Sequence, residues 1–243
     1  MFAIFKKEIN TFFASPIGYI VIGVFLVLMG LVLWVFPDYS ILDGSYANLD
    51  TLFAQAPTVF MFLIPAVTMR SFAEEKQTGT IELLVTRPIT DWQIVGGKFL
   101  ACMGLVVFAL MPTLLYYLTV YQLGAPKGNL DSGGIIGSYI GLVFLAGAFV
   151  AIGVFASSLT NNQIISFVLA TFLCFFIYLA FDLFSRLPLF YGKADDVVQS
   201  FGIQYHYESV SRGVLDTRDL VYFISLIVLF LAATVLSLGR RKW

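Results

Sequence analysis

The sequence predicts an all-α polytopic membrane protein with six transmembrane helices, folded as a single transmembrane domain over residues 1–243. Composition is the first observation: 59% of the residues are hydrophobic and only 12% are charged, whereas soluble domains are about 45–50% apolar and about 25% charged. The second observation is that apolar residues gather in six runs, each close to the roughly 20 helical residues that cross a hydrocarbon core. The runs are 17–36, 52–69, 99–123, 138–158, 164–183 and 220–238.

An amphipathic helix that lies in the membrane interface is predicted before the first span, over residues 1–15. Apolar residues recur there at spacings of three and four, and polar residues fill the other side, as in interfacial helices. The alternative is a cytoplasmic extension of the first span. Ser15-Pro16 separates the two elements because the residue before a proline avoids the helical region. The side chains to which we assign a role are Phe5, Lys6, Lys7 and Glu8.

Prolines and glycines distinguish three of the spans. Pro57 and Pro65 lie in the second span and Pro112 lies in the third, so we expect kinks in both. The fourth span is rich in glycine, which lets helix backbones approach closely in lipid. These glycines are Gly137, Gly141, Gly147 and Gly153. The fourth helix is therefore expected to be tightly packed.

The basic residues predict the orientation of the chain. With the N-terminus in the cytoplasm, nine Lys and Arg residues lie inside and five outside, and short loops with more positive charge face the cytoplasm. Four of the five outer residues belong to the long loop 184–219, where this rule is weaker. We predict that both termini are cytoplasmic.

The inner loop 70–98 holds eight of the 29 charged residues together with an apolar series. Charge keeps such a loop at the aqueous surface, and the added apolar residues favour short helices that could dock into another protein. Gly79 is expected to end a helix over about 71–78, because glycine is the usual residue after a helix end. This loop is predicted to receive force or a signal from outside the membrane.

The start of the third helix is also predicted from this loop. Thr90 and Gln93 match a capping box, so the helix should begin at about Asp91, before the membrane. Gly96-Gly97 would give a flexible point where the helix enters the bilayer. Lys98 would extend its ammonium group to the lipid headgroups.

Two further loops carry predictions. The short uncharged loop 157–163 is either a plain turn or a second, smaller partner contact. The outer loop 184–219 is longer than a compact domain normally needs and rich in apolar residues, so short helices that re-enter the outer leaflet are expected there. Gly213 should end one of them, and Asp216 or Thr217 should cap the last span.

Several chemistries are absent from the sequence. No basic stripe suits a nucleic acid, and a single histidine, His206, excludes a histidine-based metal cluster. Cys102 and Cys174 both fall in apolar runs and read as small hydrophobic residues. The spans carry almost no ionisable group, which counts against an ion-coupled carrier. No phosphate-binding P-loop is present, so any ATP and magnesium would be bound by a separate partner chain and no cofactor is expected on this one.

The inner loop resembles the signature of the ABC-transporter type-2 permease family, and the resemblance extends over the whole chain. The matching residues are Glu74-Glu75-Lys76-Gln77-Thr78-Gly79-Thr80-Ile81-Glu82-Leu83-Leu84, Arg87-Pro88-Ile89 and Gly97-Lys98. Three longer stretches are similar, more specifically, to the permease subunits linked to gliding motility in Bacteroidetes. They are residues 86–93, 157–163 and 211–216.

The resemblance implies a non-catalytic subunit of the bacterial inner membrane, part of an exporter linked to gliding motility. Its expected partners are two copies of a cytoplasmic ABC ATPase, a second permease subunit or second copy of itself, and the lipid bilayer. By position, the coupling helix that contacts the ATPase is assigned to Phe72, Glu74, Glu75, Gly79, Glu82 and Leu83. The second cytoplasmic contact is assigned to Thr160, Asn161 and Asn162.

Three alternatives stay open. The charged residues of the inner loop could form a solvated face without a partner. The protein could be a mechanical or scaffolding anchor of a motility or secretion machine through which no solute passes. A channel or secondary carrier that works alone is the third, and it would transport without any ATPase.

Overall fold

The computed structural model describes residues 1–42, 47–82, 88–187 and 195–239, and within these ranges it is all-helical, without a strand. Six helices, some of them interrupted, are long and apolar enough to cross a membrane, which confirms the predicted number of spans. The helices are α1 (Phe2–Ala14), α2 (Pro16–Trp34), α3 (Asp50–Thr68), α4 (Arg70–Gln77), α6 (Asp91–Leu110), α7 (Leu114–Leu123), α8 (Ser132–Leu159), α9 (Gln163–Phe175), α10 (Phe181–Ser185), α11 (Asp195–Gln199), α12 (Ile203–Ser211) and α13 (Thr217–Gly239).

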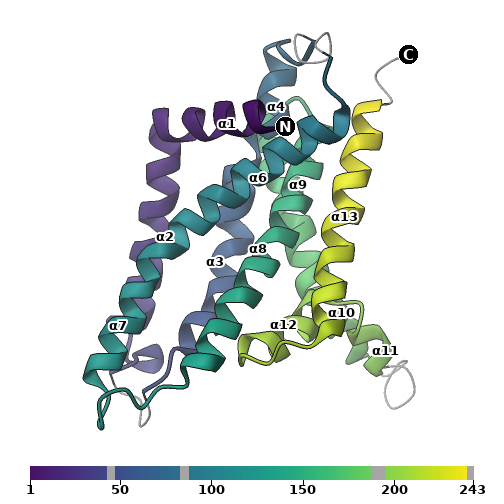
Figure 1. Cartoon of the computed structure of the whole chain (residues 1–243). Helices are drawn as coiled ribbons and strands as arrows, with labels where there is room; N and C mark the ends of the chain where they lie inside the picture. Colours follow the sequence, from purple (N-terminus) through teal and green to yellow (C-terminus); the bar gives the residue numbers. More distant parts are fainter. Residues whose placement is uncertain (43–46, 83–87, 188–194, 240–243) are drawn as a thin grey trace.

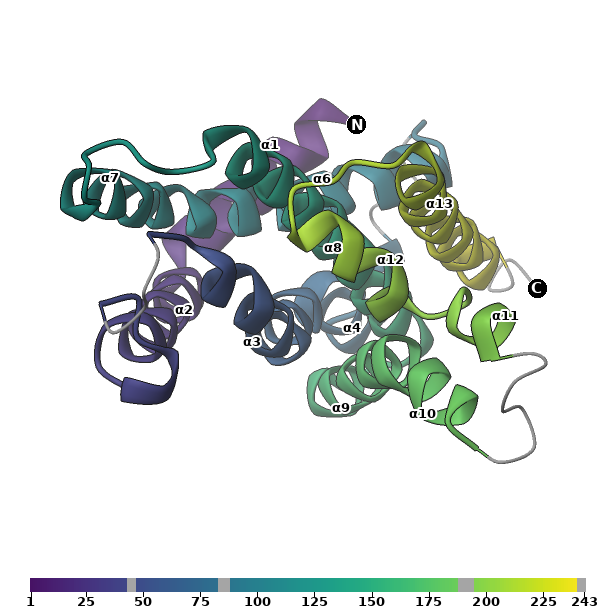
Figure 2. The ribbon, with the colours of Figure 1, turned by 90° about the horizontal axis from the view of Figure 1, so that it is seen from below.

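The helix α8 lies at the centre of the bundle and packs against α3, α6, α9 and α13 (Figures 1 and 2). In its most apolar stretch 78% of the residues are buried, against 11% in α13. The helices α1 and α4 lie at one end of the bundle, and α12 lies at the other (Figure 1). We call these the α1 end and the α12 end.

Neighbouring helices can approach α8 closely because of its glycines, as predicted. A Cβ atom added at Gly141 would overlap the side chain of Val210 on α12, and one at Gly153 would overlap Thr68 on α3. At Gly147 it would lie 2.9 Å from a methyl group of Ile227 on α13. Small residues thus let three neighbouring helices contact α8 at short range.

The prolines behave differently in the two spans. Pro112 lies in a short 3-10 turn, Met111–Thr113, which separates α6 from α7 and confirms a break in the third span. By contrast, α3 runs as one helix from Asp50 to Thr68 with both of its prolines inside. Membrane helices tolerate proline where neighbouring groups satisfy the freed backbone.

Most of the predicted helix boundaries are confirmed. Thr90 and Gln93 form the capping box and α6 begins at Asp91. Gly79, with φ +72°, follows the end of α4, and Gly213, with φ +82°, follows α12. The side chain of Asp216 accepts a hydrogen bond from the backbone N–H of Arg218 at the start of α13.

One boundary and one internal feature differ from the prediction. The fourth helix begins at Ser132 instead of residue 138, because Asp131 accepts a hydrogen bond from the backbone N–H of Gly134 and caps it there. The fifth span contains a π-helical turn, Phe176–Ala180, for which the sequence carries no signal that we recognise. The last long loop forms the short helices α11 and α12, as predicted, and α12 packs against α8 and α13.

Candidate functional site

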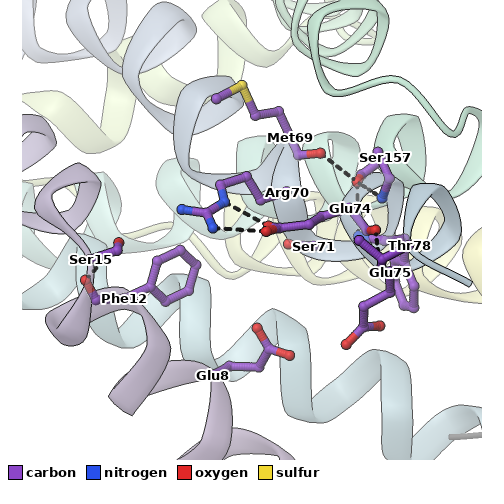
Figure 3. A network of polar contacts seen from close by, with 12 residues as sticks. Glu8, Phe12, Ser15, Met69, Arg70, Ser71, Glu74, Glu75, Thr78 and Ser157 are labelled. Atoms are coloured by element: carbon purple, nitrogen blue, oxygen red, sulfur yellow. Dashed lines mark hydrogen bonds and ion pairs between the residues drawn. The ribbon is translucent and has the colours of Figure 1, made fainter. Parts of the chain in front are cut away.

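Helix α4 continues α3 after a break at Met69 and projects from the bundle at the α1 end (Figure 1). It is the first helix of the charged inner loop. Within it, the Arg70 guanidinium donates two hydrogen bonds to the carboxylate of Glu74, at 2.7 and 3.0 Å, as shown in Figure 3. This pair, four residues apart, supports the first turn and fixes where Glu74 points.

Lys98 on α6 is buried beneath this helix, with only 1% of its surface exposed. Its ammonium group donates to the Glu8 carboxylate at 2.9 Å and to the backbone carbonyl of Ser71 at 2.6 Å. It also forms an ion pair with Glu75 at 2.9 Å. Two hydrogen bonds and two carboxylates of opposite charge surround the ammonium group, which is what burial of this charge requires.

A second lysine completes the cluster. Lys7 on α1 lies 2.8 Å from Glu75 and 3.2 Å from Glu8, so two lysines and two glutamates alternate. We call Lys7, Glu8, Glu75 and Lys98 the charge junction. It ties α1, α4 and α6 together with no net charge, and removing one member would leave the other three with an unbalanced charge.

The junction shifts the pKa values of its α1 members. Burial alone would raise the pKa of Glu8, but the positive charges of Lys98 and Lys7 outweigh it and hold this pKa below the usual value. Burial alone would lower the pKa of Lys7, but its contacts with Glu75 and Glu8 outweigh it and raise this pKa. Both shifts favour the charged forms, as expected of a stable ion-pair cluster.

The junction corrects two predictions about α6. Lys98 does not extend to the headgroups, because α1 lies across α6 and covers it. Gly96-Gly97 marks this crossing and not a flexible point. A Cβ atom added at Gly97 would lie 3.0 Å from the side chain of Ile4 on α1. Glycine is needed there because the two helices touch.

The buried side of α1 also differs from the predicted one. Its buried residues are Ile4, Glu8 and Phe12, whereas Phe2 is 76% exposed. Glu8, predicted on the polar side, turns inward because Lys98 supplies its counter-charge. Phe5 is half-buried against the core and Lys6 is exposed.

The residues assigned to the coupling helix separate into two groups. Phe72 is fully buried and Glu75 is 8% exposed, so both side chains already have partners inside the chain. Glu74 is half-buried, and Gly79 and Glu82 are exposed. Leu83 lies outside the described residues.

The second assigned contact is an open surface. Asn161 and Asn162 are exposed and Thr160 is half-buried. The side chain of Asn162 accepts hydrogen bonds from the backbone N–H groups of Ile164 and Ile165 and so caps α9. This residue therefore has a structural role in addition to any contact with a partner.

An open groove of about 430 Å³ lies between α4 with the residues after it and the second assigned contact. Lys76 and Ile81 line it from the α4 side, and Leu159, Thr160 and Asn161 line it from the loop after α8. The ammonium group of Lys76 also donates to the backbone carbonyl of Ser158. Sequence reasoning assigned the two contacts separately and missed Lys76, Ile81 and Leu159. The sequence shows that these three residues are basic or apolar, but only the fold brings them together in one groove.

Comparison with known proteins identifies the family of the chain. The family model described as "ABC-2 family transporter protein" matches residues 2–243. The chain is 28% identical over 127 residues to the protein named "Probable multidrug ABC transporter permease YbhR" in Escherichia coli strains K12 and O157:H7. That match covers 52% of this chain and 32% of the relative, so it spans about a third of the relative's length. The chain belongs to the ABC-2 transporter family, as a non-catalytic transmembrane permease component.

Proposed function

We propose that this chain is the membrane half of an ATP-driven transporter and receives the movement of a cytoplasmic ABC ATPase at its α1 end. The observation that carries the proposal is the groove shared by α4 and the loop after α8. Permeases of this family generally pair with ABC ATPase subunits. The excess of basic residues in the loops of the α1 end supports a cytoplasmic orientation.

Within this proposal, the contact is made by exposed groups only. Gly79, Glu82 and Asn161 are exposed, and Asn161 lines the groove. Glu74 is half-buried and pairs with Arg70. Phe72 and Glu75 act from inside, by holding α4 in place. The full assembly would contain two ATPase copies and a second permease subunit, or a second copy of this chain. ATP and magnesium would bind to the ATPase.

The contact is tested by reversing the charge of Glu82, an exposed residue assigned to the ATPase contact. In Glu82→Lys, the ATPase that copurifies in mild detergent should fall about tenfold, because charges in an interface select the partner and like charges repel. The matched control is Asp196→Lys, which makes the same charge change on an exposed residue near the α12 end. Equal copurification of both variants would contradict the assigned contact.

The orientation is tested separately by thiol labelling. In inverted vesicles, whose outer surface is the cytoplasmic face, a membrane-impermeant maleimide should label a single cysteine at Asn161 but not one at Asp196. The native cysteines, Cys102 and Cys174, are buried and serve as the background. Labelling of position 196 but not of position 161 would overturn the proposed docking site.

We further propose that the transporter is an exporter linked to gliding motility. Support comes from residues 86–93, 157–163 and 211–216, which are similar to motility-associated permeases, and from the multidrug transport in the relatives' name. Deletion of the gene should abolish spreading on agar, and the unaltered gene should restore it. Normal spreading of the deletion strain would remove the motility link and leave the docking site untouched.

One observation favours a second candidate, an anchor through which no solute passes. The central helix α8 carries no Asp, Glu, Lys or Arg from Ser132 to Leu159, so it offers a charged solute no partner. Vesicles that contain the permease and its ATPase separate the two functions. ATP-dependent uptake or release of any tested solute would exclude the anchor.

A further inference from the structure

The first turn of α4 is capped by a residue far away in the sequence. The first backbone N–H groups of a helix have no partner within the helix, and a neighbouring side chain normally satisfies them. In α4 the residue just before the helix is Met69, whose side chain makes no capping hydrogen bond. Instead, the hydroxyl of Ser157 on α8 accepts hydrogen bonds from the N–H groups of Phe72 and Ala73, both at 3.0 Å.

The same hydroxyl also bonds to the end of α3. Ser157 donates to the backbone carbonyl of Met69 at 2.9 Å, so its three contacts meet at the break between α3 and α4 (Figure 3). A serine hydroxyl has one proton to donate and two lone pairs to accept. All three are used, and the side chain is fully buried.

The neighbouring residue holds the other end of α4. The backbone carbonyl of Ser158 accepts from Lys76, in the last turn of α4. The last turn of α8 therefore contacts α4 at both ends, and it leads directly into Thr160 and Asn161 of the groove. Movement of α4 relative to this loop would break several of these bonds.

We propose that Ser157 is a positioning residue that fixes α4 and the loop 160–162 as one rigid docking surface. This inference rests on the proposed function, because only the proposed function makes this surface the docking site of the ATPase. Ser157 itself would not touch the ATPase. It would set the angle at which α4 leaves α3, and so transmit ATPase movement to both helices together.

The test compares Ser157→Ala with Ser158→Ala in the permease–ATPase complex. Ser158 is the matched control, because it is also buried and its hydroxyl bonds only to the carbonyl of Phe155 in its own helix. Spin labels at Thr78 and Asn161, both exposed, report the distance between α4 and the loop. In Ser157→Ala we expect the distance distribution to widen about twofold, because three buried backbone groups lose their partner and the first turn frays.

The second readout is ATP hydrolysis by the complex. Ser157→Ala should reduce the stimulation of the ATPase by the permease while the two proteins still copurify. A wider distance distribution with normal stimulation of the ATPase would support the role of Ser157 in positioning α4. The same result would overturn the proposed function of the surface. An unchanged distribution would overturn the role of Ser157, whatever happens to the proposed function. If Ser157→Ala does not fold, Ser157→Cys replaces it, since a thiol forms weaker hydrogen bonds, and a distribution like that of Ser158→Ala would then refute the proposal.

Discussion

Different interactions hold the helices together at the two ends of the bundle. At the α1 end, the charge junction joins α1, α4 and α6 through ion pairs in which Lys98, Glu8 and Glu75 are buried and Lys7 is partly exposed. At the α12 end, contact depends on small residues and on hydrogen bonds to backbone carbonyls. The hydroxyl of Tyr207 donates to the carbonyl of Phe53 at 2.8 Å, and that of Ser138 donates to the carbonyl of Ser211 at 2.8 Å.

A largely buried polar pair, His206 and Asp219, joins two helices at the α12 end as well, but it joins fewer elements than the charge junction. Nδ1 of His206 lies 2.7 Å from the Asp219 carboxylate, and Nε2 lies 2.9 Å from the carbonyl oxygen of Ser200. The ring stacks on Tyr222 with the centroids 3.9 Å apart. This arrangement fixes α12 to the start of α13, whereas the charge junction fixes three helices at once.

The difference shows how each end can be perturbed. Ion pairs in a buried site depend on the presence of every partner, so removal of one charge has a large effect. Close packing depends on volume, so a single added methyl group has a large effect there. The α1 end should therefore respond most to charge and pH, and the α12 end to side-chain size.

The largest effect is expected from Lys98→Met. Glu8 and Glu75 would keep only Lys7 as counter-charge, and breaking a buried ion pair in this way costs about 3–5 kcal/mol of stability. Unfolding in detergent, followed by circular dichroism, measures the loss. Lys6→Met is the control, because Lys6 is exposed on the same helix as Lys7. Similar unfolding curves for the two variants would show that the junction contributes little.

The next effect is expected at the α12 end from Gly141→Ala. The added methyl group overlaps Val210, and overpacking of this kind costs about 1–3 kcal/mol. Gly23→Ala on α2 is the control, because nothing lies within 4 Å of its added Cβ atom. That control should stabilise by up to about 1 kcal/mol, since alanine favours a helix more than glycine does. A loss of stability in both variants would point to a cause other than contact with α12.

A smaller effect is expected from pH, and it should be confined to the α1 end. The folded-state pKa of Glu8 is lowered, so its contribution to stability is present above the unfolded value near 4.5 and is lost as the pH falls through the folded value. The pKa of Lys7 is raised, so its contribution is present below the unfolded value near 10.5 and is lost as the pH rises through the folded value. Glu8→Gln should flatten the acid side of the stability profile only. An unaltered acid side would mean that other carboxylates control it.

The sequence was sufficient to predict the number of spans and most helix ends, because both follow from local rules. A capping box places Asp91 at the start of α6, and Gly79, with positive φ, follows the end of α4. Both features depend on neighbouring residues and not on distant parts of the chain. The glycines of the fourth span, among them Gly141 and Gly153, likewise predicted a tightly packed α8. The helices that these glycines contact could not be read from the sequence.

The charge junction could not be predicted, because it depends on helices far apart in the chain. Lys98 and Glu8 are separated by 90 residues, and a lysine near a helix end ordinarily reaches the headgroups. Only the crossing of α1 over α6 buries it. Ser157 was missed for the same reason: a serine in a short loop looks like a turn residue until α4 is seen above it.

The smallest effect is expected from Arg212→Ala at the α12 end. Arg212 forms an ion pair with Glu208 at 2.6 Å, shorter than any pair in the charge junction, but both side chains are largely exposed. Water screens such pairs and two long side chains lose freedom in forming them, so the loss should be about 0–1 kcal/mol. The same unfolding measurement used for Lys98→Met allows direct comparison. If Arg212→Ala were as destabilising as Lys98→Met, burial would not be what distinguishes the two ends, and the number of helices joined by each pair would have to be considered instead.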